Sequence, residues 1–146
     1  MRAIGSPFLA IAAVLLGLAA ISPAAAAAKL VHPGRRVTCL AGDGGFMMTM
    51  PVLTTCVQND LPIVVVVANN SGLGMVRDNL KASRIAVDYA DVDFARIAEG
   101  LGCKGLRVDA AGQLDDAIAE AHRSGAPCVI DVKVDPDSSH TQVSHY

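Results

Sequence analysis

The sequence contains no tryptophan, and only two tyrosines and three phenylalanines among its 146 residues. Proteins that bind nucleic acid without base-specific contacts stack bases on aromatic side chains and follow the phosphates with clustered positive charge. Here the aromatic residues are too few, and the 12 lysines and arginines are scattered along a chain of net charge −2. These two shortages exclude a nucleic-acid-binding protein.

The sequence also lacks the cysteine patterns of zinc and redox sites. Its four cysteines stand at positions 39, 56, 103 and 128, with no CxxC pair and no cysteine–histidine spacing typical of zinc. Cys39 and Cys128 lie in apolar stretches, where a free cysteine behaves as a small buried hydrophobic residue. We therefore expect reduced thiols with a structural role.

Charged residues are scarce, at 18% of the chain, whereas hydrophobic residues make up 52%. A composition this apolar is not that of a disordered chain, and 146 residues suffice for one domain with a core but not for two large ones. We assign residues 22–134 to this domain. Residues 1–21 form an apolar N-terminal segment of uncertain nature, and residues 135–146 form a polar C-terminal tail that we expect to be frayed.

No apolar run reaches the length of a membrane-spanning helix. Such a helix needs about 20 consecutive apolar residues, and the N-terminal run covers only residues 8–21. Arg2 before this run and the small residues 24–28 behind it resemble a secretory signal. Under that interpretation, the protein would be exported or membrane-associated through residues 1–28.

The same region also fits a buried helix over residues 22–31. Ser22 would be its N-cap and Pro23 would take the first helical position, where the missing N–H costs nothing. His32-Pro33-Gly34 would then end the helix. Because an export signal would remove a helix that the domain needs, we favour the helix and expect a cytoplasmic protein.

Two apolar runs of strand length each end in a polar, glycine-rich turn. Residues 37–41 lead into Gly42-Asp43-Gly44-Gly45, and residues 63–68 lead into Asn69-Asn70-Ser71-Gly72. The carboxyl ends of neighbouring parallel strands share one edge of a sheet, where open α/β sheets bind ligands. A carboxylate, a side-chain amide and several glycines at such an edge suit a hard divalent cation and a phosphate ester.

Apolar periodicity along the rest of the chain alternates between helix and strand. In residues 93–102 the apolar side chains fall at helical spacing, with Asp93 as the N-cap and Gly102 as the C-cap. We predict further helices at 49–58, 75–80 and 113–123, and further strands at 105–108 and 127–134. This order predicts an α/β fold: a doubly wound parallel sheet with flanking helices.

At this point the sequence resembles a known family. The letters GDG at 42–44 are followed, after the 24 residues 45–68, by NN at 69–70, which resembles the thiamine-diphosphate motif. The surrounding GDGGFMM and NNSGLGMVR resemble acetolactate synthase and 2-oxo-acid decarboxylases. The resemblance covers about residues 24–134 and implies their C-terminal diphosphate-binding domain. Residues 1–20 do not resemble the family, so we expect the fold to be truncated on its N-terminal side.

The resemblance implies a set of site residues. The side chains of Asp43 and Asn70 and the backbone carbonyl of Gly72 would bind Mg²⁺, while Asn69 would shape the loop. Diphosphate oxygens and water would complete the octahedron. We expect thiamine diphosphate to contact nine residues: Gly42, Asp43, Gly44, Gly45, Asn70, Gly72, Leu73, Gly74 and Met75.

Family enzymes also need a glutamate from a pyrimidine-binding domain, and no such domain is recognisable here. We therefore expect no catalytic residue in this chain, which would be a fragment or a split subunit. Its partners would be further copies of itself or a separate pyrimidine-binding subunit, and the complete assembly would act on a 2-oxo acid. The alternative is a degenerate, non-catalytic domain that only binds partner subunits.

Other polar residues carry no clear function. The four histidines, at positions 32, 122, 140 and 145, all lie away from the motif, and we interpret them as ordinary surface residues. The acidic stretch 88–93 fits a solvated loop better than a second metal site. Three methionines follow the first turn, at 47, 48 and 50, as core residues or cofactor contacts.

Overall fold

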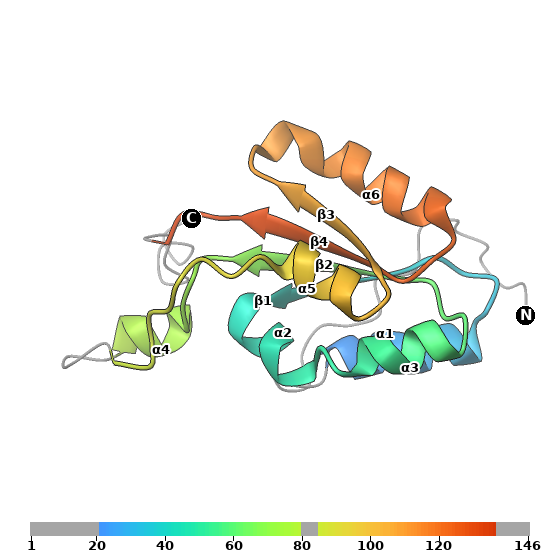
Figure 1. The fold of residues 1–146 in the computed structure, drawn as a ribbon, viewed down its shortest axis with the longest axis horizontal. Coiled ribbons are helices and arrows are strands. Elements are labelled where there is room, and N and C mark those ends of the chain that lie inside the picture. Colours follow the sequence, from blue (N-terminus) through green and yellow to red (C-terminus); the bar gives the residue numbers. More distant parts are fainter. Residues whose placement is uncertain (1–20, 80–84, 137–146) are drawn as a thin grey trace, which may run out of the picture.

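Residues 21–79 and 85–136 are described by a computed structural model of the chain. The apolar segment 1–20, the predicted helix end at residue 80 and the tail from residue 137 onwards lie outside the described residues. The described elements alternate along the chain (Figure 1). In order they are α1 (Ile21–Val31), β1 (Val37–Gly42), α2 (Asp43–Thr49), α3 (Val52–Gln58), β2 (Ile63–Asn69), α4 (Gly74–Asn79), α5 (Phe94–Gly100), β3 (Lys104–Val108), the 3-10 turn η1 (Ala111–Gln113), α6 (Leu114–Ser124) and β4 (Cys128–Lys133).

The four strands form one parallel sheet in the order β1-β2-β4-β3. β2 lies between β1 and β4, and six of its seven residues are buried. A strand that is covered on both faces needs apolar side chains in succession, which explains its unbroken run of valines. The predicted α/β fold with a parallel sheet and flanking helices is therefore confirmed.

Helices cover both faces of this sheet (Figure 1). On one face, α1, α2, α3 and α5 contribute to a core in which Phe46 and Phe94 meet edge to face, with ring centroids 5.5 Å apart. On the other face, α6 covers a smaller core that includes Ile130 of β4. All four cysteines are free and buried, as expected, and burial raises the pKa of the Cys39 thiol to about 12.

The predicted N-cap of α5 is confirmed, whereas its C-cap is Leu101, one residue before the predicted Gly102. The Asp93 side chain accepts a hydrogen bond from the Arg96 N–H at 2.9 Å, which makes it the N-cap of α5. Beyond α5 and α6, Gly102 and Gly125 adopt φ angles of +85° and +65°. Glycine enters this left-handed conformation without a steric penalty, so both helices end there.

The helix predicted for 49–58 is confirmed as α3, which begins three residues later than expected, but the helix before it was missed. α2 begins directly at Asp43, so the glycine-rich motif forms the first turn of a helix rather than a separate loop. A second helix, α3, begins at Val52. Pro51 separates the two because it has no N–H to donate to the preceding turn.

The helix predicted over 22–31 is confirmed as α1, but Ser22 is not its N-cap. Ile21 is already helical, and the buried Ser22 hydroxyl instead accepts a hydrogen bond from Thr49 Oγ1 at 3.5 Å. Lys29, although 8% exposed, reaches the Arg35 carbonyl at 2.7 Å. None of the helices described here is long and apolar enough to span a bilayer.

Candidate functional site

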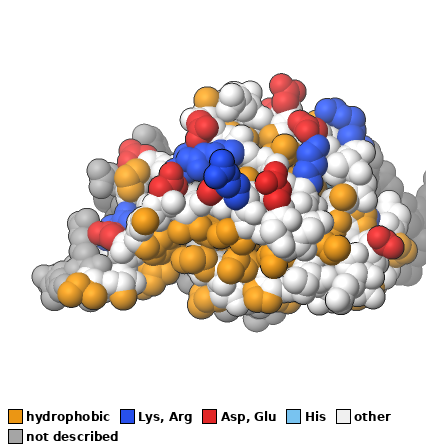
Figure 2. Space-filling view, in the orientation of Figure 1, with side chains coloured by type: hydrophobic (Ala, Val, Ile, Leu, Met, Phe, Trp, Pro, Cys, Tyr) orange, Lys and Arg blue, Asp and Glu red, His pale blue; other side chains and the backbone are white. Residues whose placement is uncertain are grey.

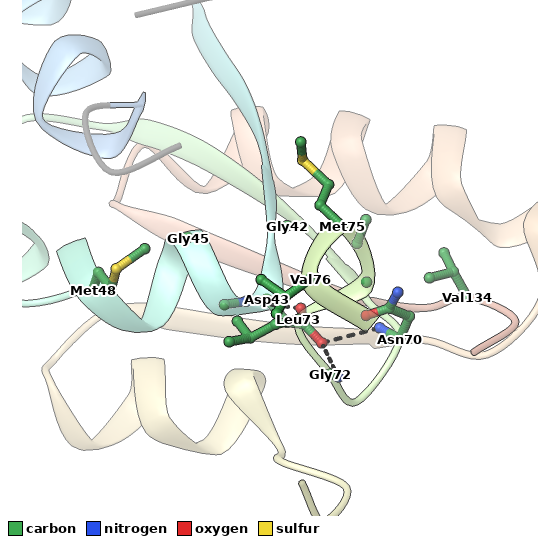
Figure 3. A pocket seen from close by; sticks show the side chains of 13 residues that line it. Gly42, Asp43, Gly45, Met48, Asn70, Gly72, Leu73, Met75, Val76 and Val134 are labelled. Carbon is green, nitrogen blue, oxygen red and sulfur yellow. Dashed lines mark hydrogen bonds between the residues drawn. The ribbon is translucent and has the colours of Figure 1, made fainter. Parts of the chain in front are cut away.

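A cleft of about 590 Å³ opens where β1 and β2 end (Figure 3). Its walls come from the start of α2, from the loop after β2, from α4 and from the end of β4. The lining residues are Gly42, Asp43, Gly44, Gly45, Met48, Ala68, Asn70, Gly72, Leu73, Gly74, Met75, Val76 and Val134. All nine residues expected to contact the cofactor are among them.

Asp43 connects the two motif halves. Its carboxylate is only 3% exposed and accepts three backbone N–H groups: Gly44 on Oδ1 at 2.7 Å, and Asn70 and Gly72 on Oδ2 at 3.1 and 3.2 Å (Figure 3). A buried carboxylate is tolerated only when such donors replace the lost water. Asp43 therefore holds the loop after β2 against the first turn of α2.

The Asn70 amide completes a cluster of oxygens. Its oxygen faces the Gly72 carbonyl oxygen at 2.8 Å and Asp43 Oδ2 at 3.3 Å. With its oxygen in this place, the amide faces two other acceptors and needs a cation between them, whereas the reversed amide would donate to both neighbours. In an Mg²⁺ octahedron with bonds of about 2.0–2.1 Å, neighbouring ligand oxygens lie about 2.9 Å apart. The donor set and its spacing therefore fit a small hard divalent cation.

A short antiparallel segment supports the loop on its outer side. The Leu73 N–H donates to the Val87 carbonyl at 2.9 Å, and the Tyr89 N–H donates to the Ser71 carbonyl at 3.2 Å. Gly72 lies between these bonds and is in van der Waals contact with the guanidinium of Arg77, so that a Cβ at Gly72 would overlap it. A side chain at this position would therefore displace the Arg77 guanidinium from its bonds and crowd the Val87 carbonyl oxygen at 3.0 Å.

Arg77 holds this arrangement together. Its side chain is only 9% exposed, and its Nε donates to Asp88 Oδ1 at 2.6 Å. Its Nη1 reaches the Pro136 carbonyl at 2.5 Å, beyond the end of β4. One buried guanidinium therefore links α4, the outer segment and the chain after β4.

The cleft combines a polar floor with an apolar rim. Asp43 is the one ionisable side chain among the described lining residues, and no lysine or arginine lines this part of the cleft. At the rim, Met48, Met75 and Val76 are 61%, 52% and 43% exposed. Hydrophobic side chains also gather across the middle of the face seen in Figure 2. This combination suits a ligand with one anionic end and one apolar ring.

Comparison with known proteins agrees with this geometry. The family model described as "Thiamine pyrophosphate enzyme, C-terminal TPP binding domain" matches residues 6–132. The chain belongs to this family. The match begins at residue 6 rather than at about residue 24, so the expectation that residues 1–20 are unlike the family is wrong for residues 6–20.

Several thiamine pyrophosphate enzymes are similar to the chain. Acetolactate synthase of Bacillus subtilis is 40% identical over 116 residues, which cover 77% of this chain and 20% of the synthase. Pyruvate oxidase of Lactiplantibacillus plantarum is 40% identical over 121 residues, or 79% of this chain and 20% of the oxidase. The chain thus spans about a fifth of the length of these relatives.

Among solved structures, the thiamine diphosphate-dependent 4-hydroxybenzoylformate decarboxylase of Rhodococcus jostii RHA1 shares the fold with a TM-score of 0.73. The two are 32% identical, and the match covers 80% of this chain and 23% of the decarboxylase. Together these comparisons identify the chain as the thiamine-pyrophosphate-binding domain of acetolactate-synthase-like and decarboxylase-like enzymes.

Within this thiamine pyrophosphate domain, the structure distinguishes the roles of the three methionines that follow the first motif half. Met48 lines the cleft, whereas Met47 and Met50 pack against the core. The lining residues Ala68, Val76 and Val134 were not predicted, and for Met48 the sequence had left open whether it packs in the core or contacts the cofactor. Val134 could not be found from local patterns, because only the pairing of β4 with β2 brings it to the cleft.

Tyr89 was also missed. Its hydroxyl is buried beside the motif. Within the described part of the chain, no hydrogen-bond partner is found for this oxygen. Burial, together with the negative charge of Asp43, raises the pKa of Tyr89 well above its usual value. The phenol is therefore a neutral group at physiological pH.

The remaining polar predictions can be placed as well. His122 is half-buried and lies 2.8 Å from Thr38 Oγ1, so it is not an ordinary surface residue. Burial, and then the positive charges of Arg36 and Lys29, lower its pKa. In the acidic stretch, Asp88 forms an ion pair with Arg77, and Asp91 forms ion pairs with Arg107 and Lys133.

Proposed function

We propose that this chain binds thiamine diphosphate together with Mg²⁺ in the cleft at the ends of β1 and β2. Asp43, Asn70 and the Gly72 carbonyl would hold the cation, and the apolar rim would contact the heterocyclic part of the cofactor. The observation that carries the proposal is the convergence of the Asp43 carboxylate, the Asn70 side-chain amide and the Gly72 carbonyl in one cleft, with the amide 2.8 Å from the carbonyl oxygen and 3.3 Å from the carboxylate. A diphosphate placed here would need that cation, because the described lining offers no positive side chain.

We also propose that the complete assembly acts on a 2-oxo acid, by decarboxylation with or without carboligation. When bound, thiamine diphosphate supplies the carbon nucleophile and the electron sink for such reactions, while the protein binds and orients it. The relatives include a synthase, an oxidase and a decarboxylase by name. The substrate would therefore be selected by parts of the assembly other than the described cleft.

A partner domain would supply the catalytic glutamate. Asp43, the carboxylate that lines the described part of the cleft, already accepts three backbone N–H groups. It is thus committed to holding the loop and the cation. We propose that a second copy of this chain, or a separate pyrimidine-binding subunit, closes the cleft and brings that glutamate.

Isothermal titration calorimetry tests the binding proposal. Thiamine diphosphate is titrated into the folded chain with Mg²⁺ and then with EDTA, and thiamine without its diphosphate serves as the matched control. We expect binding of the diphosphate only when Mg²⁺ is present. A folded chain that binds neither form would refute the proposal and leave the non-catalytic subunit-binding domain as the better interpretation.

A further inference from the structure

An aspartate lies in the buried part of strand β4, among apolar residues. Asp131 is fully buried, at 0% exposure, and burial raises the pKa of its carboxyl group. Each oxygen accepts one hydrogen bond: Oδ1 from Asn69 Nδ2 at 2.9 Å and Oδ2 from the Phe94 N–H at 3.0 Å. Asp131 does not line the cleft. A buried carboxylate is costly, so its place beneath the motif calls for a role.

The partner of Asp131 is the first asparagine of the motif. Asn69 is also fully buried, and its Nδ2 donates both to Asp131 and to the Val92 carbonyl, each at 2.9 Å. Its Oδ1 accepts the Ser71 N–H at 3.2 Å. A carboxylate can only accept hydrogen bonds. Asp131 therefore turns the NH₂ of Asn69 inward and leaves the amide oxygen facing Ser71.

Ser71 lies between the two proposed cation ligands of the loop. It adopts a left-handed backbone conformation, with φ at +55°, which is uncommon for a residue with a side chain. The bond from its N–H to Asn69 supports this conformation, and Lys133 of β4 reaches its hydroxyl at 3.3 Å. The turn at Ser71 determines where the Asn70 amide and the Gly72 carbonyl stand relative to Asp43.

We infer that Asp131 is a positioning residue for the cation site: through the Asn69 amide it fixes the turn that presents Asn70 and Gly72 to the cation. This inference rests on the proposed function, because it assumes that those two residues bind a cation. Asp131 also accepts the first N–H of α5, which is a purely structural role. The experiment must therefore separate the effect through Asn69 from the effect through α5.

The test uses Asp131→Asn in the full chain. The new amide cannot both accept from Phe94 and accept from Asn69, so the Asn69 amide loses its fixed orientation. We expect backbone hydrogen exchange at Ser71 and Gly72 to accelerate about tenfold or more, measured without any cation. We also expect Mn²⁺ affinity, measured by water-proton relaxation, to fall by about tenfold, the lower end of the loss for a direct partner of a metal ligand, because Asp131 acts through Asn69.

Two control variants test the alternative. Asp93→Ala removes the N-cap of α5 without touching Asn69, and Ile130→Val lowers stability in the same strand on the face that α6 covers. Both should leave Ser71 exchange and Mn²⁺ affinity near the wild-type values. If Asp93→Ala reproduces the changes of Asp131→Asn, the effect passes through α5 and the inference is refuted.

A double substitution covers the possibility that Asp131→Asn does not fold. Combining Asn69→Asp with Asp131→Asn exchanges donor and acceptor and preserves net charge, leaving only the bond to the Val92 carbonyl unmade. We expect Ser71 exchange to return towards the wild-type rate. The inference is overturned if the double variant folds but its Ser71 N–H exchanges as fast as in Asp131→Asn. It is also overturned if Asp131→Asn alone keeps the wild-type exchange rate and Mn²⁺ affinity. Absence of Mn²⁺ binding by the wild-type chain would instead refute the proposed function, and the cation-free exchange result would still stand.

Discussion

Asp43→Asn removes the one charge that lines the described part of the cleft while keeping the shape of the side chain. The carboxylate accepts three N–H groups, from Gly44, Asn70 and Gly72. An amide can direct its oxygen to Asn70 and Gly72, but its NH₂ then faces the Gly44 N–H. One buried donor loses its acceptor, which costs about 1–3 kcal/mol of stability without ligands. Part of that loss is offset because a charge no longer has to be buried.

The effect on ligand binding should be larger than the effect on folding. Losing an outer partner of a metal ligand costs about 10- to 100-fold in affinity, and Asp43 is proposed as a ligand itself. At ligand concentrations of 100 times Kd, binding stabilises the wild-type fold by about 2.7 kcal/mol. For a chain of this size that raises Tm by about 5–11 °C. A 100-fold weaker variant gains only about 0.4 kcal/mol, or roughly 1 °C.

Thermal unfolding with Mg²⁺ plus thiamine diphosphate, compared with EDTA plus thiamine diphosphate, measures this difference. Glu99→Gln is the matched control, because it removes one negative charge from an exposed position on α5. We expect that control to keep the full ligand-induced rise in Tm. If Asp43→Asn keeps it too, Asp43 does not bind the cation and the proposed site is wrong.

Three further substitutions test other parts of the structure. Gly72→Ala places a Cβ against the guanidinium of Arg77, so we expect the free energy of unfolding, measured with urea, to fall by about 1–3 kcal/mol. The control Gly112→Ala has open space around it and should lose much less stability. Equal losses in the two variants would contradict the packing described. Asp93→Ala removes the N-cap of α5 and should cost about 1 kcal/mol in the same assay, whereas Asp93→Asn should cost little; a neutral alanine variant would refute the cap. The pKa of His122 lies below its ordinary value of 6.5 in the folded chain, so the unfolded chain takes up the proton first and stability falls as pH drops below about 6.5. His122→Gln should flatten this part of the Tm–pH curve, and an unchanged slope would show that another group titrates there.

The cleft could be predicted from sequence because each half of the motif directly follows its own strand. Buried parallel strands are recognisable by apolar runs, and the edge they share needs no knowledge of the rest of the fold. The helical state of the first half was missed, since glycines at 44 and 45 disfavour a helix in isolation. In the structure, the bond from Gly44 to Asp43 and the complete burial of Phe46 hold that turn in helical form.

The contribution of β4 could not be predicted by the same means. Strand order depends on contacts between distant segments, and no local pattern shows that β4 lies beside β2. That pairing brings Val134 to the cleft and Asp131 beneath Asn69. A lone aspartate within an apolar strand was a signal in the sequence, but its partner became identifiable only from the three-dimensional arrangement.

In the proposed complex, the described cleft lining offers no lysine or arginine to the diphosphate, so the cation would be its positive partner and the two binding equilibria would be coupled. If the cation raises the affinity for the diphosphate by a given factor, the diphosphate must raise the affinity for the cation by the same factor. Titrating either ligand at several fixed concentrations of the other therefore measures one coupling constant twice. If the proposed function holds, a fall in free Mg²⁺ would act on the cleft as a fall in the supply of thiamine diphosphate.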